Sequence, residues 1–285
     1  DESTVVLSLL TAMIESGNGK GSAWGARQQL IDLSPKEIGA EVAEAAIQNV
    51  GGVRVDSGEY TVIFGPQAVA ELFSNLLSPH FNLGLVDFGV SLYQGKFNQQ
   101  ITSPLLNLYD DPIMPDGAGS KRVTDEGAPT RRTDLVKAGT LVGYLSDYSM
   151  YSRMLEKPDE ATEKLGDDPG SSLDAIAPHN GFRFSLGGGR VAASGVGVHA
   201  TNFVIGSDSP QSEEDILKGV DNGIYIGRLW YTYPVGGYAS GIISGTAVAD
   251  SYVIRDGKLA EPILPNTLRI EDNIGEMMQN VIGVG

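Results

Sequence analysis

The stretch AVADSYVIRDGKLAEPI, residues 247–263, says most about how this chain folds. It consists of two runs with strand-forming residues around Asp256 and Gly257, a pair that suits the type I′ turn of a β-hairpin. The preceding segment IYIGRLWYTYPV, residues 224–235, is rich in β-branched and aromatic residues and also predicts a strand. The 37 glycines of the chain favour many turns and strands. We therefore predict a β-rich protein rather than a helical bundle.

Upstream of this region, the first 65 residues are predicted to hold a strand, a loop, a helix and a hairpin. The strand covers residues 5–14, and the loop covers residues 17–34, GNGKGSAWGARQQLIDLS, which show no apolar period. Ser34 is a candidate helix cap, Pro35 suits the first helical position, and Glu37 completes a capping box. GVRVDSGEYTVIFG, residues 52–65, is typical of a hairpin.

Two further helices are predicted toward the end of the chain. In SDSPQSEEDILKGVDNG, Ser212 is the candidate cap and Asp215 closes the capping box, and Asn222 and Gly223 are expected to end the helix. IEDNIGEMMQNVIG, residues 270–283, carries an apolar stripe and predicts a closing helix.

The helix predicted in GPQAVAELFSNLLSPH, residues 65–80, raises the question of a metal site. Its apolar residues recur at the spacing of a core-facing stripe, and Glu71 lies off that stripe and is expected to face water. His80 is nine residues further on, about 180° away at roughly 100° per residue, and Pro79 breaks the helix first. The histidines of the zinc signature His-Glu-x-x-His lie on one helix face, so Glu71 and His80 cannot form such a site locally.

Composition excludes several classes of protein. With no cysteine among its 285 residues, the chain has no disulfide, thiolate zinc site or cysteine nucleophile. A net charge of -16 disfavours nucleic acid, whose phosphates require clustered Lys and Arg. Since no apolar run approaches the roughly 18 residues of a membrane span, we expect a soluble protein. The first residue is Asp1, which is compatible with an excised portion of a longer protein.

Charged residues gather in a long polar stretch at 109–132, which we regard as the candidate binding loop. Carboxylates and guanidiniums on one loop could hold the termini of a peptide or a cation. Alternatively, they cap turns and pair with each other on a solvated surface. The candidates in this loop are Asp110, Asp111, Asp125, Glu126, Arg131 and Arg132.

Three other features have weaker chemical meaning. GGGRVA, residues 187–192, matches a loose dinucleotide pattern, but strand-like residues follow where a helix is required. His80, His179 and His199 could converge as zinc ligands, although no local spacing supports this. The segment 156–180 is acidic and bears Pro, Gly and Ser, which predicts an exposed insertion.

The order of motifs resembles the TldD/PmbA family, peptidase-related proteins once called modulators of DNA gyrase. The resemblance rests on SPKEIGAEVAEAAIQNVGG with SGEYTVIFGPQAVAELF, on DDP with DEGAPTRRTDLVKAGTLVGYL, on SEEDILKGVDNGIYI, and on SGIISGTAVADSYVIRDGKLAEPI with the closing helix. Where many relatives have Thr-Gly-Asp-Phe-Ser, this chain has SGIIS at 240–244, without the acidic residue. The resemblance implies an α+β, β-rich C-terminal domain, a curved antiparallel sheet (pseudo-barrel) with a few flanking helices. It also implies that 1–285 is the C-terminal part of a longer protein, with 1–34 a joining segment.

The resemblance also implies a division of labour. In the TldD branch this helix carries His-Glu-x-x-x-His, and a later cysteine helps to hold zinc. Here the helix has Glu71 alone and the chain has no cysteine, so it is similar to the PmbA, or TldE, branch. That branch is the metal-free, cytoplasmic partner of a zinc-bearing TldD subunit in a heteromer that cleaves unfolded peptides, including precursors of peptide antibiotics. Two alternatives remain: a self-sufficient peptidase with a non-standard site, and a homodimeric binding or assembly module.

Overall fold

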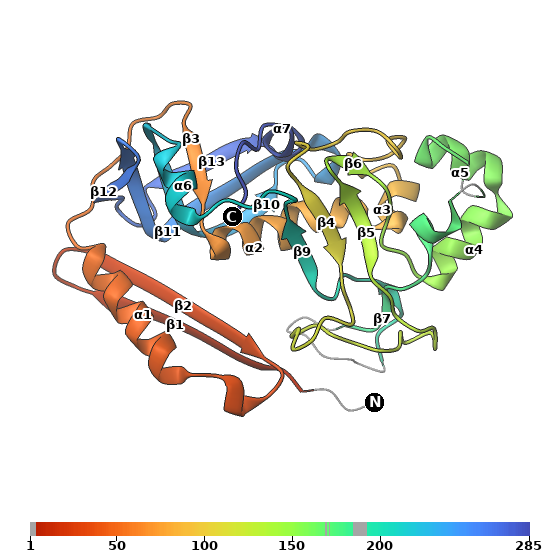
Figure 1. Ribbon diagram of the computed structural model, residues 1–285, viewed down its shortest axis with the longest axis horizontal. Helices are drawn as coiled ribbons and strands as arrows, with labels where there is room; N and C mark the ends of the chain where they lie inside the picture. Colours follow the sequence, from red (N-terminus) through yellow and green to blue (C-terminus); the bar gives the residue numbers. More distant parts are fainter. Residues whose placement is uncertain (1–3, 169, 171, 185–192) are drawn as a thin grey trace.

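The computed structural model describes residues 4–168, 170, 172–184 and 193–285. Within these residues the strands form four separate sheets, of two, five, four and two strands, and no closed barrel is present. The α+β class is confirmed, but the single curved antiparallel pseudo-barrel is not what the strands form. One pairing is also parallel, between β3 and β10. Figure 1 shows the five-stranded sheet on the left and the four-stranded sheet on the right.

The N-terminal unit is a hairpin of β1 (Val6–Ile14) and β2 (Gly19–Arg27), covered on one face by α1 (Pro35–Gln48). We call residues 4–48 the arm. The prediction of a loop at 17–34 is wrong over half of its length, because residues 19–27 pair with β1 throughout. The glycines have a packing reason: a Cβ on Gly21 would lie 2.4 Å from the backbone nitrogen of Ala46 in α1. The helix therefore rests directly on the backbone of the strand.

The five-stranded sheet forms the main layer beside the arm. Its strands are β3 (Thr61–Phe64), β10 (Asn222–Pro234), β11 (Ile242–Arg255), β12 (Lys258–Pro262) and β13 (Leu268–Asn273). The predicted hairpin between β11 and β12 is confirmed, with φ of 49° at Asp256 and 69° at Gly257. The hairpin predicted at 52–65 is wrong, because β3 instead pairs in parallel with β10. Sequence patterns do not distinguish a local partner from one that lies far along the chain.

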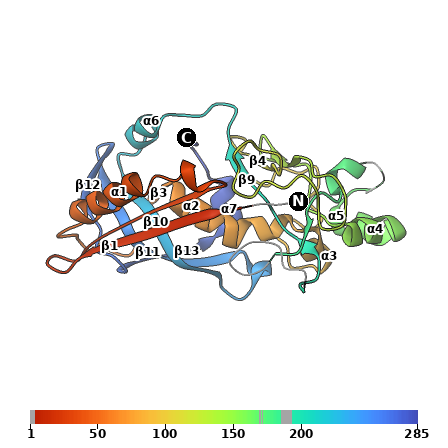
Figure 2. The same ribbon diagram turned by 90° about the horizontal axis from the view of Figure 1, so that it is seen from below.

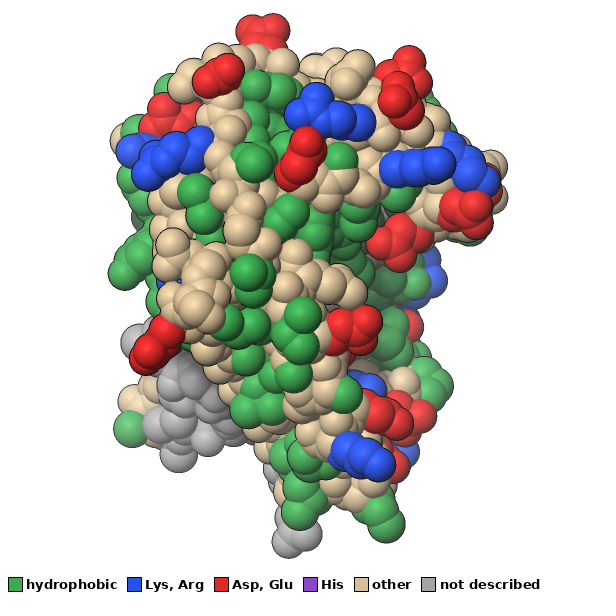
Figure 3. All heavy atoms as spheres, turned by 90° about the vertical axis from the view of Figure 1, so that its left-hand side faces the viewer, with side chains coloured by type: hydrophobic (Ala, Val, Ile, Leu, Met, Phe, Trp, Pro, Cys, Tyr) green, Lys and Arg blue, Asp and Glu red, His purple; other side chains and the backbone are tan. Residues whose placement is uncertain are grey.

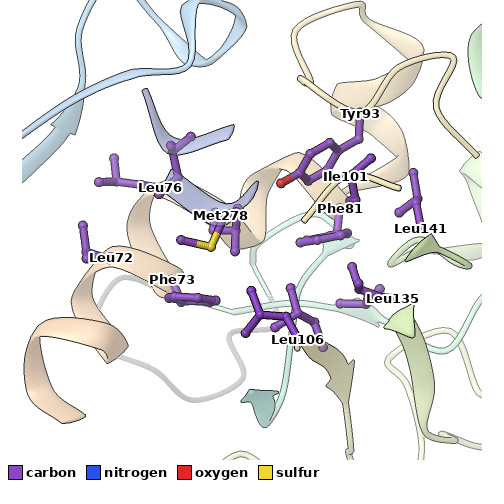
Figure 4. Packing of buried hydrophobic residues seen from close by; sticks show 14 of the residues in the cluster. Leu72, Phe73, Leu76, Phe81, Tyr93, Ile101, Leu106, Leu135, Leu141 and Met278 are labelled. Atoms are coloured by element: carbon purple, nitrogen blue, oxygen red, sulfur yellow. The ribbon is translucent and has the colours of Figure 1, made fainter. Parts of the chain in front are cut away.

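Helix α2 (Pro66–Leu72) begins at the predicted proline and packs against β10. It continues as a π-helical turn, Phe73–Leu77, and a 3-10 turn, Ser78–Phe81. Its apolar stripe faces the main hydrophobic core, as predicted. Figure 4 shows Leu72, Phe73 and Leu76 from this helical segment grouped with Phe81 and with Met278 of the closing helix. This packing fixes the opposite face of α2 toward the outside.

The second large sheet is four-stranded and lies beside α4 and α5, which are at the right-hand end of Figure 1. Its strands are β4 (Asn107–Asp110), β5 (Thr133–Lys137), β6 (Thr140–Leu141) and β9 (Phe203–Gly206), and β7 (Gly181–Phe182) pairs with β8 (Gly197–Val198). The remaining α-helices are α3 (Leu83–Asp87), α4 (Tyr148–Glu156), α5 (Pro158–Leu165), α6 (Glu213–Lys218) and α7 (Ile274–Gln279).

Three sequence predictions are compared with the structure in this part. Most described residues of segment 156–180 are exposed or partly exposed, as predicted, although α5 packs Leu165 and a later turn packs Ile176 into the main core. Ser212 caps α6 as predicted, accepting a hydrogen bond from the amide of Asp215, but the helix ends at Lys218 and β10 begins at Asn222. Helix α7 is shorter than predicted, because β13 occupies residues 268–273.

The charge on the surface and the apolar character of the helices bear on the expectations drawn from composition. On the face in Figure 3, acidic and basic side chains are interspersed with hydrophobic ones, and no continuous basic surface covers it. In the described part of the chain, no helix has both the length and the apolar character needed to cross a membrane.

Candidate functional site

A hollow of about 270 Å³ lies between the arm and the outer face of α2. In Figure 2 the arm crosses in front of α2. The arm is held to the body at two places: in the middle of β2, Ser22 Oγ donates to Asp250 Oδ2 at 3.3 Å, and just after β2, Gln28 Nε2 donates to the carbonyl of Gly117 at 2.7 Å. We call the space between these attachments the arm hollow. Its lining is Trp24, Gln67, Ala70, Glu71, Ser74 and Asn75.

Glu71, the one carboxylate of this lining, is paired with a cation from the sheet below. Arg228 Nε lies 3.6 Å from Glu71 Oε1, and only 8% of the Arg228 side chain is exposed, against 30% for Glu71. Burial raises the pKa of Glu71, and the charge of Arg228 opposes that rise. The expectation that Glu71 faces water therefore holds only in part. Helical periodicity places Glu71 outside the apolar stripe but gives no information about Arg228.

A second carboxylate, that of Asp250, shares Arg228 with Glu71. Burial raises its pKa to about 6, and hydrogen bonds from Ser22 and the charge of Arg228 act against that rise. Asp250 has a left-handed backbone, with φ of 49°. Its Oδ1 atom is buried and has no hydrogen-bond partner among the described residues. The site thus places two carboxylates, those of Glu71 and Asp250, beside a single guanidinium, that of Arg228.

The described residues, which include all three histidines, contain no group of three or more His, Asp or Glu side chains that could hold a metal ion. His80 is buried, accepts a hydrogen bond at Nδ1 from the amide of Leu92, and has its pKa lowered by burial to about 4. His179 Nδ1 lies 3.2 Å from the carbonyl of Pro129, and His199 packs against the ring of Phe184. A three-histidine zinc site is not formed. The dinucleotide pattern at 187–192 lies outside the described residues.

Asp110, the first of the candidates in the candidate binding loop, is fully buried at the end of β4. Its carboxylate accepts hydrogen bonds from the amide and hydroxyl of Thr201, at 2.7 and 3.0 Å, and from Asn180 Nδ2 at 2.7 Å. Burial raises its pKa, and these hydrogen bonds oppose the rise. Asp111 accepts a hydrogen bond from the amide of Ile113. The carboxylate of Asp110 joins distant segments of the body, whereas that of Asp111 holds its own turn.

The other candidates of the loop also make contacts within the chain, each at a different place. Asp125 accepts a hydrogen bond from the amide of Arg183, and Glu126 accepts one from the amide of Tyr148. Arg132 pairs with Asp134 at 2.8 Å and stacks 3.6 Å from the ring centroid of Tyr109, whereas Arg131 is exposed. The structural alternative, in which these charges hold turns, accounts for these contacts. The sequence does not reveal the arm hollow, because its pattern predicts a loop where strand β2 forms one wall.

Sequence comparison identifies the domain type. Residues 57–285 match the sequence model of the PmbA/TldA metallopeptidase C-terminal domain. A metalloprotease of Methanothermobacter thermautotrophicus is 27% identical over 252 residues, covering 88% of this chain and 48% of the relative. A metalloprotease TldD homolog of Haemophilus influenzae is 25% identical, covering 88% of this chain and 45% of the relative. The chain therefore spans about half the length of these relatives.

Structural comparison supports the fold. TldE from Thermococcus kodakarensis is similar, with a TM-score of 0.76 and 23% identity over 99% of this chain and 57% of its own. A suggested modulator of a DNA gyrase from Thermotoga maritima has a TM-score of 0.77, with the same identity and coverage. Both alignments include the arm, which lies entirely ahead of the matched domain.

Proposed function

We propose that this chain, which belongs to the PmbA/TldD metallopeptidase family, is a PmbA/TldE-like subunit that supplies no catalytic zinc to a peptide-cleaving complex. The proposal rests on which residues helix α2 carries and on how its acidic residue is paired. On the resemblance, this helix corresponds to the one that bears His-Glu-x-x-x-His in the zinc-binding branch. Here its only acidic residue, Glu71, is paired with Arg228. A zinc site needs three or four protein ligands, and this helix offers one carboxylate that already has a partner.

The partner in this proposal is a TldD-like subunit that carries the zinc, the water it activates and the general base. The substrate is an unfolded peptide, which would lie extended along the arm hollow, where strand β1 offers an edge for pairing. We place this complex in the cytoplasm. The exposed Arg131 of the candidate binding loop, with Arg132 beside it, would face the partner or the peptide, while Asp110, Asp111, Asp125 and Glu126 hold the loop in position.

Elemental analysis and a reconstitution assay test the proposal. The purified chain should contain far less than one zinc per molecule and should not cleave an unfolded peptide. Mixed with the zinc-bearing family member of the same organism, it should co-elute in size-exclusion chromatography and cleavage should appear. Stoichiometric zinc together with unaided cleavage by the isolated chain would overturn the proposal and favour a self-sufficient peptidase.

The homodimeric assembly module remains a second candidate because of the face of the arm hairpin that α1 does not cover. Val5, Leu7, Leu9 and Met13 of this face are all large hydrophobic residues that are nearly half or more exposed. A face of this kind is typical of association surfaces. Size-exclusion chromatography with light scattering distinguishes the two candidates. A homodimer that does not bind the zinc-bearing partner would support the assembly module.

A further inference from the structure

The two walls of the arm hollow differ in chemical character. The arm contributes Trp24, which is 46% exposed. Leu9 is its partner in the register of β1 and β2 and is 62% exposed, so it extends the wall on the same face. A half-exposed tryptophan offers an apolar surface and a ring face that attracts cations.

The wall formed by α2 carries negative charge and no positive charge. Glu71 is flanked there by Gln67 and Ser74, at the spacing of four and three residues that places side chains on one helix face. Arg228, beneath Glu71, is nearly inaccessible and is shared with Asp250. A carboxylate has about four lone-pair positions, so the single contact between Glu71 and Arg228 leaves acceptor capacity.

The size of the hollow suits one side chain rather than a complete small-molecule ligand. Its volume of about 270 Å³ lies below the roughly 300–1,000 Å³ of pockets that enclose drug-sized ligands. It is open to the outside and lies between two attachments of the arm. An extended peptide could therefore place one side chain in it while its backbone runs along the arm.

We propose that the arm hollow is a specificity subsite for a basic side chain, Arg or Lys, of an extended peptide. The stem of the side chain packs on Trp24, and its cationic end donates hydrogen bonds to the carboxylate of Glu71 and lies against the ring face of Trp24. This inference rests on the proposed function in that it names a preference of the same peptide-binding surface. It assigns selectivity to the chain that carries no catalytic group.

Binding of labelled peptides by the isolated chain tests the subsite. The probes are unstructured peptides of Gly, Ser and Ala with one central residue, either Arg or citrulline, which has the same shape without the charge. Fluorescence anisotropy should give tighter binding of the Arg peptide by roughly tenfold, from one cation–π contact and one partly buried ion pair. Glu71→Gln should reduce this ratio to about one. The control Glu163→Gln, which removes an exposed acid on α5, should leave it unchanged.

A second variant guards against a structural effect of Glu71→Gln. Trp24→Leu keeps an apolar surface at an exposed position and should lower the ratio of the Arg to the citrulline peptide by roughly three-fold through loss of the cation–π contact. Equal binding of the two peptides, no binding of either, or a ratio that survives both substitutions would overturn the subsite. The assay needs neither zinc nor a partner, so the subsite can fail while partner-dependent cleavage stands, and the reverse.

Discussion

The packing of α1 on the backbone of β2 makes a prediction with a matched control. A Cβ on Gly21 would lie 2.4 Å from the nitrogen of Ala46 and 2.5 Å from the carbonyl oxygen of Val42. Neither backbone atom can move without shifting the helix, so Gly21→Ala forces α1 away from the strand. Overpacking of this kind costs about 1–3 kcal/mol. In contrast, Gly39 lies inside α1 with nothing within 4 Å of its Cβ position. Gly39→Ala should stabilise the arm by roughly 0.5–1 kcal/mol.

The two variants are expected to differ by roughly 1.5–4 kcal/mol, the sum of these opposite effects. The effect should be confined to the arm, because its small cluster of Ala23, Ile38 and Val42 is separate from the main core. Hydrogen exchange measured by mass spectrometry should show faster exchange in β2 and α1 of Gly21→Ala and slower exchange in Gly39→Ala, with β10 and β11 unaffected. Equal protection of the arm in both variants would refute the packing argument.

Three further outcomes are expected, each measured by chemical denaturation. Burial lowers the pKa of His80 from 6.5 to about 4, so the folded state prefers the neutral ring and loses stability as pH falls below 6.5. His80→Asn should therefore remove about 1.3 kcal/mol of the stability that the protein loses between pH 7.5 and 5.5. Identical pH profiles of stability for the two proteins would contradict this. Arg228→Met should cost roughly 1–3 kcal/mol at pH 7 by leaving two carboxylates without their cation, and less at pH 5.5, because burial raises the pKa of Asp250 to about 6 and its carboxyl group is then largely protonated. An equal cost at both pH values would count against the shared pair. Asp110→Ala removes three hydrogen bonds at a fully buried position and should lower the free energy of unfolding by about 3 kcal/mol. Asp111→Ala removes one hydrogen bond and should lower it by about 1 kcal/mol. The reverse order would contradict the buried position of Asp110.

The buried position of Asp110 shows why charge in a polar stretch is an incomplete guide to a site. In the sequence, Asp110 stands beside Asp111 in a run of loop residues, and nothing there indicates that one carboxylate is less accessible than the other. The tertiary structure brings Asn180 and Thr201 onto Asp110 from 70 and 91 positions along the chain. The hydrogen bonds that satisfy the carboxylate come entirely from these distant segments, so no local pattern could have separated the two residues.

Local chemistry by itself determined several elements of this protein. Asp256 and Gly257 accept the left-handed backbone that closes the β11–β12 hairpin, and Pro66 and Ser212 mark helix starts, because turns and caps depend on neighbouring residues. The absence of cysteine and of a zinc signature on α2 was equally plain in the sequence. Only the tertiary structure decided that the glycines of β2 form a strand under α1, that β3 pairs in parallel with β10, and that Arg228 pairs with Glu71. These features depend on contacts between residues far apart in the chain, whose partners are selected by packing and burial rather than by the period of any one segment.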